Sequence, residues 1–188
     1  MYNAIEEAIH FMVLAFKGQR RKNENIDKSF HSMSVGMMIR NVTETQDVIV
    51  AALLHDIIND TEYGYEEIEE KFGTLVADIV MDLSEDHSRT KWLDRKKDFI
   101  ERMRDNADIN VINIMVADKL HNLLSDYELY QKMGDKMWKY SKGTKEENSW
   151  LYKECYYIAK KKGASEWLLG RYKKILLEYF GDLDEESI

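Results

Sequence analysis

A histidine and an aspartate, His55 and Asp56, interrupt an otherwise apolar stretch of this chain. Burying an ionised carboxylate costs several kcal/mol unless it is paired, hydrogen-bonded or bound to a metal ion. Two further polar residues, His31 and Asp118, also stand among apolar residues. A single divalent cation would account for all four residues, so we expect them to form a metal site.

The four residues offer two imidazoles and two carboxylates, which is a mixed nitrogen and oxygen ligand set. This set suits Mn²⁺ or Fe²⁺, with Zn²⁺ as a third candidate, and it contains no thiolate that would select a soft metal. A cation held in this way keeps coordination positions for water and for a substrate oxygen, as hydrolytic metals do. The pattern therefore predicts hydrolytic chemistry.

Three polar residues are spaced to support such a site. Asn59 and Asp60 lie one helical turn beyond the His-Asp pair, on the same expected helix face. We predict that they are catalytic residues that orient or deprotonate the attacking water. Asn122 lies one turn after Asp118 and is placed to hydrogen-bond a ligand.

Each residue also has a simpler interpretation. His31 could be a structural histidine, and Asp118 could form an ion pair with its neighbour Lys119. His121 is expected to be a surface or packing residue, and we leave His10 and His87 out of the site. The metal hypothesis is favoured because every simpler interpretation needs a separate buried partner.

Composition narrows the class of protein. The chain has 188 residues, of which 44% are hydrophobic, so it can fill one core. Its net charge of −8 argues against nonspecific binding to nucleic acid. A single cysteine, an N-terminus without a basic region and the lack of a bilayer-length apolar stretch predict a soluble, cytoplasmic protein without a disulfide or a membrane partner.

Helical periodicity runs through almost the whole sequence, and proline is absent. We therefore predict one all-α domain, with a helix that begins after Thr45 and carries His55, and a capping box at Thr144. Gly73 and Gly181 are expected to end helices. The other expected helices cover approximately residues 5–16, 29–42, 65–73, 75–83, 92–103, 111–129 and 164–180. The expected domain is 1–181, with core signature 15–126, C-terminal helices 130–181 and an acidic tail 182–188.

The order H…HD…D resembles the signature of the HD phosphohydrolase superfamily. The surrounding segments are similar to the hydrolase domain of Rel/SpoT-type alarmone enzymes, and over roughly residues 3–160 to their small stand-alone members. The segments similar to the hydrolase domain are residues 19–22, 53–61, 72–73 and 117–122. Those similar to the stand-alone members are residues 84–86, 92, 95–96, 138 and 150.

The resemblance implies an all-helical HD fold and a Mn²⁺-dependent enzyme that removes the 3′-pyrophosphate of guanosine tetra- or pentaphosphate. The same four residues would hold the metal. The residues implied to contact the nucleotide are Arg21 and Lys22 at the base, Asn122 at the ribose and Arg95 at a phosphate.

The chain departs from the family pattern at Asn59, where the motif has a glutamate, and at Ser32, where it has a proline. An amide cannot act as a general base, so we expect turnover to be slower by about 10–10³-fold. Two alternatives therefore stay open: an HD phosphatase for another nucleotide, and a weakened HD protein that binds a nucleotide. The aromatic C-terminal helices are expected in the core, with a homodimer surface as the alternative.

Overall fold

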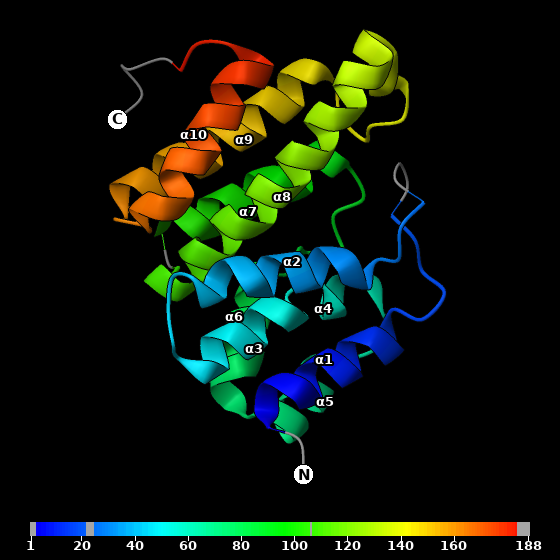
Figure 1. The fold of residues 1–188 in the computed structure, drawn as a ribbon, viewed down its shortest axis with the longest axis vertical. Coiled ribbons are helices and arrows are strands. Elements are labelled where there is room, and N and C mark those ends of the chain that lie inside the picture. Colours follow the sequence, from blue (N-terminus) through cyan, green and yellow to red (C-terminus); the bar gives the residue numbers. More distant parts are fainter. Residues whose placement is uncertain (1–2, 22–24, 106, 184–188) are drawn as a thin grey trace. The chain divides into compact units, whose positions relative to one another are not determined.

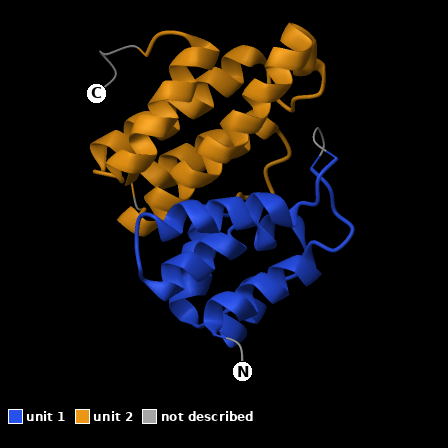
Figure 2. Ribbon diagram, in the orientation of Figure 1, with its two compact units in different colours: residues 1–84 blue, residues 85–188 orange. Residues whose placement is uncertain are grey.

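The computed structural model describes residues 3–21, 25–105 and 107–183. Within these ranges the regular structure is helical, apart from one isolated antiparallel bridge between Arg20 and Asp27. The internal contacts divide the chain into two compact units, Met1–Ser84 and Glu85–Ile188 (Figure 2). No helix in the described ranges has the length and hydropathy to cross a membrane.

The first unit is built around α3, whose residues from Val48 to Leu54 are all buried. A helix that is apolar on every side must be covered on every side. Accordingly, α3 packs against α1, α2 and α6 (Figure 1). The helices of this unit are α1 (Ala4–Ala15), α2 (Ser29–Arg40), α3 (Gln46–Leu54), α4 (Ile57–Asp60), α5 (Tyr65–Phe72) and α6 (Thr74–Leu83).

The second unit is organised by the long helix α8, which packs against α9, α10 and the 3-10 helix η1 (Figure 1). Its core is rich in aromatic rings, and Tyr179 stacks on both Trp138 and Phe180. The buried tyrosines of α9 and α10 confirm that these aromatic helices contribute to the core. The helices of this unit are α7 (Trp92–Asp105), α8 (Ile109–Met133), η1 (Gly134–Lys139), α9 (Lys145–Lys161) and α10 (Glu166–Phe180).

Several helix ends agree with the sequence predictions. The Glu147 backbone amide donates to Thr144 Oγ1 at 3.1 Å, and the Thr144 amide donates to the Glu147 carboxylate at 2.8 Å, so the predicted capping box is confirmed. Gly73 and Gly181 follow the last residues of α5 and α10 with φ of 88° and 79°. A side chain is strained in this left-handed region, which explains glycine at both positions.

The predicted continuous helix through the His-Asp pair is wrong. Helix α3 ends at Leu54 and α4 begins at Ile57, so His55 and Asp56 occupy the junction between two helices. Asp56 has φ −97° and ψ −2°, in the bridge region where many active-site residues lie. Thr45 does precede α3, but its side chain makes no capping hydrogen bond.

Helix α10 begins with help from another helix. The backbone amide of Ser165, the residue before α10, donates to the side-chain oxygen of Asn113 on α8 at 2.8 Å. Asn113 is buried, and the Ser165 hydroxyl makes no capping bond of its own. A polar side chain in α8 is therefore satisfied by the backbone that starts α10.

Candidate metal centre

Two buried histidines face each other in the first unit. His31 lies in the first turn of α2 and His55 lies directly after α3, with exposed fractions of 1% and 3%. Their Nε2 atoms are 3.2 Å apart. This close approach brings together the two imidazoles that the sequence pattern predicted as metal ligands.

The hydrogen bond on the far side of His55 identifies its tautomer. His55 Nδ1 lies 2.8 Å from the backbone oxygen of Ala52, and a carbonyl oxygen can only accept. Nδ1 therefore carries the proton, so in the neutral ring the lone pair is on Nε2, which faces His31. Metal-binding histidines are oriented in this way by a hydrogen bond from the other ring nitrogen.

The carboxylate of Asp56 lies beside both rings. Its two oxygens are 3.7 Å from His31 Nε2 and 3.6 Å from His55 Nε2. The side chain is 22% exposed, so this edge of the cluster is accessible to water. Two imidazole nitrogens and a carboxylate that converge on one point fit a divalent cation such as Mn²⁺, Fe²⁺ or Zn²⁺.

Asp118 lies in the second unit, in the middle of α8, and is buried. Lys119 Nζ approaches one of its carboxylate oxygens to 2.6 Å, and Asn122 Nδ2 donates to the other at 2.6 Å. The ion pair with Lys119 that the sequence offered as an alternative is therefore present. It does not exclude metal binding, because each carboxylate oxygen has a second lone pair.

Charged residues link Asp118 to α7 through Lys119, Glu85 and Lys96. Burial disfavours the charged form of Lys119, but the nearby carboxylate of Asp118 outweighs it and raises the pKa of Lys119 above its usual value. Glu85 pairs with Lys96 and accepts a 3.1 Å hydrogen bond from Arg95. Burial opposes ionisation of Glu85, but Lys96 outweighs it and lowers the pKa of the carboxyl group.

Arg95, which the resemblance places at a substrate phosphate, is part of this network. Its guanidinium also donates to the backbone oxygens of Arg89 and Thr90, at 3.0 and 3.2 Å. These bonds hold Arg95 at the start of α7. A contact between Arg95 and a phosphate stays a prediction.

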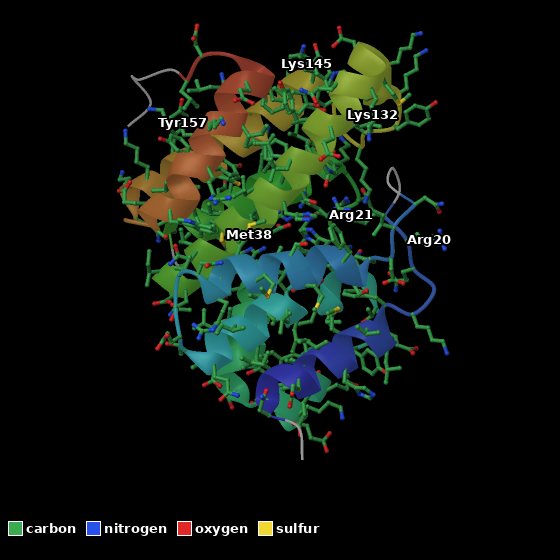
Figure 3. The ribbon with its side chains drawn as sticks, in the orientation of Figure 1. Arg20, Arg21, Met38, Lys132, Lys145 and Tyr157 are labelled. Carbon is green, nitrogen blue, oxygen red and sulfur yellow. The ribbon has the colours of Figure 1, made fainter. Side chains whose placement is uncertain are left out.

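Arg21, which the resemblance places at the guanine base, lies on the connection between α1 and α2. Figure 3 shows Arg20 and Arg21 on this connection. Arg20 bonds the backbone and side chain of Asn25, while the Arg21 amide donates to the oxygen of Ile26 at 3.0 Å. Lys22, the other predicted base contact, lies outside the described residues.

The two residues predicted to assist the attacking water, Asn59 and Asp60, form the second half of α4. The Asp60 carboxylate forms an ion pair with Lys28, a contact that the sequence analysis did not predict. In the sequence, Lys28 is one of several basic residues that follow the first helix, with Lys17, Arg20, Arg21 and Lys22, and such a run of charges is more often solvated. The predicted roles of Asn59 and Asp60 in catalysis are untested by this geometry.

Comparison with known families gives the chain its class. The model of the HD domain family matches residues 8–138, which is more than half of the chain. The chain belongs to the HD domain family. The resemblance stated from the sequence is thereby confirmed at the level of the family.

Several relatives of this HD protein are pyrophosphohydrolases by name. The guanosine-3′,5′-bis(diphosphate) 3′-pyrophosphohydrolase MESH1 of Xenopus tropicalis is 35% identical over 123 residues, covering 63% of this chain and 67% of the relative. The pyrophosphohydrolase of the same name from Haemophilus influenzae is 35% identical over 98 residues. That match covers 50% of this chain and only 14% of the Haemophilus protein.

Two solved structures share the fold. One, described as a metazoan ortholog of SpoT that hydrolyzes ppGpp, matches 97% of this chain and 98% of its own with a TM-score of 0.76 and 22% identity. The other, a protein of Listeria monocytogenes EGD-e, matches 81% of this chain and 99% of its own with a TM-score of 0.71 and 28% identity. The all-α HD fold expected from the sequence is therefore confirmed.

Proposed function

We propose that this HD protein is a metal-dependent pyrophosphohydrolase that releases pyrophosphate from the 3′ position of ppGpp or pppGpp. The observation that carries the proposal is the buried pair of Nε2 atoms of His31 and His55, 3.2 Å apart, with the Asp56 carboxylate beside them. The relatives named as ppGpp pyrophosphohydrolases support the choice of substrate.

In this proposal the metal would be held by the four residues that the sequence pattern predicts as ligands: His31, His55, Asp56 and Asp118. Mn²⁺ is the proposed ion, with Fe²⁺ and Zn²⁺ as alternatives. When bound, such an ion lowers the pKa of a water ligand and polarises a phosphoryl oxygen. The hydrogen bond from His55 Nδ1 to Ala52 keeps the other ring nitrogen available as a ligand.

The proposed substrate contacts come from residues that the resemblance assigns. Arg21 and Lys22 would contact the guanine base, Asn122 the ribose and Arg95 a phosphate. The Asn122 side-chain amide donates to Asp118, so it would hold that carboxylate in place beside the ribose.

Asp60 is the carboxylate proposed to accept a proton from the attacking water, because Asn59 offers only an amide. The presence of Asn59 in α4 also favours a second candidate function. In that case the protein binds a guanine nucleotide but hydrolyses it slowly or not at all. Both functions share the same metal ligands and differ in turnover.

The test is an assay of the Mn²⁺-loaded protein with ppGpp, in which GDP and pyrophosphate are separated by ion-exchange chromatography. Pyrophosphate release that is lost in Asp56→Asn and kept in Asp94→Asn, a change of an exposed carboxylate on α7, supports the proposal. Orthophosphate release from a nucleoside monophosphate would instead identify another HD phosphatase. Tight ppGpp binding without turnover would favour the second candidate, and failure to bind any of Mn²⁺, Fe²⁺ and Zn²⁺ would overturn both.

A further inference from the structure

Asp60 is held from two sides by the connection between α1 and α2. The Gln19 side-chain amide donates to the Asp60 backbone oxygen at 3.0 Å. Lys28, at the other end of the connection, forms an ion pair with the Asp60 carboxylate. One residue of α4 therefore contacts both ends of a segment that is distant in the sequence.

The two ends of this connection are also joined to each other. The Lys28 backbone amide donates to the Gln19 oxygen at 3.1 Å, and an isolated bridge pairs Arg20 with Asp27. The Lys28 ammonium lies 5.2 Å from the centre of the buried Phe16 ring, which adds a cation–π contact. These contacts make the Lys28–Asp60 pair part of a network, whereas an isolated exposed ion pair contributes little.

The network connects Asp56, an expected metal ligand, to Arg21, an expected contact of the nucleotide base. On one side, the backbone amide of Asp60 donates to the backbone oxygen of Asp56 at 3.1 Å. On the other side, Arg21 follows the bridged residue Arg20, and its backbone amide donates to the backbone oxygen of Ile26, next to the bridged residue Asp27. A displacement of Lys28 from Asp60 would therefore shift Arg21 relative to the metal ligands.

We propose that Gln19 and Lys28 are positioning residues: through their contacts with Asp60 they hold the connection between α1 and α2, which carries Arg21, against α4. The inference rests on the proposed function in one respect, namely that Arg21 contacts the nucleotide. It assigns Asp60 a second role, in substrate affinity, beside any part that its carboxylate has in proton transfer. Because Arg21 is proposed to contact the base and not the reacting phosphate, losing its position should remove binding that the ground state and the transition state share, which raises KM.

The test compares steady-state kinetics of Lys28→Met with those of Lys28→Arg in the Mn²⁺-loaded protein. We expect Lys28→Met to raise KM for ppGpp by about 10-fold with unchanged metal content, whatever the change in kcat, because Lys28 also pairs with the proposed proton acceptor Asp60. Lys28→Arg should restore KM because it keeps the charge. Lys17→Met, which removes an exposed lysine nearby, is the matched control and should behave as the wild type.

A double variant tests whether both residues act through the same contact. If Lys28 acts through Asp60, then Lys28→Met should raise the Kd for ppGpp no further in a protein that already carries Asp60→Asn; Kd is measured because Asp60→Asn removes the proposed proton acceptor. Additive increases in Kd, or a fall in kcat with unchanged KM for Lys28→Met, would overturn the inference.

Hydrogen exchange provides a readout that does not depend on activity. The amides of Arg21 and Lys28 are hydrogen-bonded within the connection, so they should exchange faster in Lys28→Met while the amides of α6 stay unchanged. If the wild type fails to hydrolyse ppGpp but these amides respond, the proposed function fails and the positioning role stands. If the amides do not respond, the positioning role fails whatever the activity.

Discussion

Gly36 of α2 lies directly against the side chain of Leu53 of α3. A Cβ atom at Gly36 would come within 2.5 Å of Leu53 Cδ2 and 2.8 Å of its Cγ, closer than packed atoms allow. Gly36 shares α2 with His31, and Leu53 belongs to α3, which ends directly before His55. The absence of a side chain at Gly36 therefore permits the close approach on which the facing imidazoles depend.

Substitution Gly36→Ala should weaken both stability and metal binding. Leu53 is 3% exposed and has little room to move, so the added methyl should push α2 away from α3. We expect a loss of about 1–3 kcal/mol in the free energy of unfolding, as for other overpacked cores. Urea denaturation and Mn²⁺ titration measure the two effects.

Gly170→Ala is the matched control for that change. Gly170 lies inside α10, and no atom is within 4 Å of a Cβ placed there. Alanine should stabilise the helix by up to about 1 kcal/mol without affecting Mn²⁺ affinity. An unchanged unfolding midpoint for Gly36→Ala would show that Leu53 accommodates the methyl group.

Substitution Asn59→Glu should raise kcat for ppGpp hydrolysis by about 10–10³-fold, because it restores a carboxylate that can accept a proton. Metal content should not change, since Asn59 is not among the expected ligands. Initial rates under saturating substrate measure the effect. Asn59→Gln serves as the control of equal length, and an equal gain from this amide would argue against proton transfer.

Lys119→Met should destabilise the protein by about 3–5 kcal/mol, because it leaves the Asp118 carboxylate buried without its cation. Both side chains are about one-eighth exposed, at 13% and 12%. The pKa of Lys119 is raised, so its ion pair contributes fully below the usual lysine pKa and is lost only as the pH rises through the raised value.

The destabilisation should therefore be the same at about pH 6 and about pH 9, as measured by chemical denaturation. Lys97→Met removes an exposed lysine of α7 and should have little effect. A difference between the two pH values would mean that Lys119 titrates in this range, contrary to its raised pKa.

Cys155 should be unreactive in the folded protein. It is 1% exposed, and burial raises the pKa of its thiol to about 12. Because the thiolate is the reactive form, alkylation by iodoacetamide near pH 8 should be at least about 100-fold slower in the native than in the urea-unfolded protein. Mass spectrometry over time measures both rates, and rapid labelling of native protein would contradict the burial of α9.

Local signals in the sequence predicted the helix ends well. Thr144 and Glu147 form a capping box from neighbouring residues, and Gly73 and Gly181 need only their own backbone angles to end a helix. These features depend on a few adjacent residues, so the sequence contains the necessary information.

Features that depend on distant contacts were harder to predict. The apolar pattern continues through Ile57 and Ile58, so nothing local marked the helix break at His55 and Asp56. The Lys28–Asp60 pair joins residues far apart in the sequence, and a basic loop is usually solvated. The pairing of His31 and His55 was predictable because a polar side chain in an apolar stretch needs a polar partner when it is buried. This requirement holds whichever helices supply the partner.

The bond between Asn113 and Ser165 has a consequence for the order of folding. A helix as short as α10 is marginal in isolation, since forming its first turn fixes several residues for a single hydrogen bond. Here the amide just before that turn finds its acceptor only on α8, so nucleation of α10 is favoured after α8 has formed. We therefore expect α10 to form late on the folding pathway, on a surface that α8 already provides.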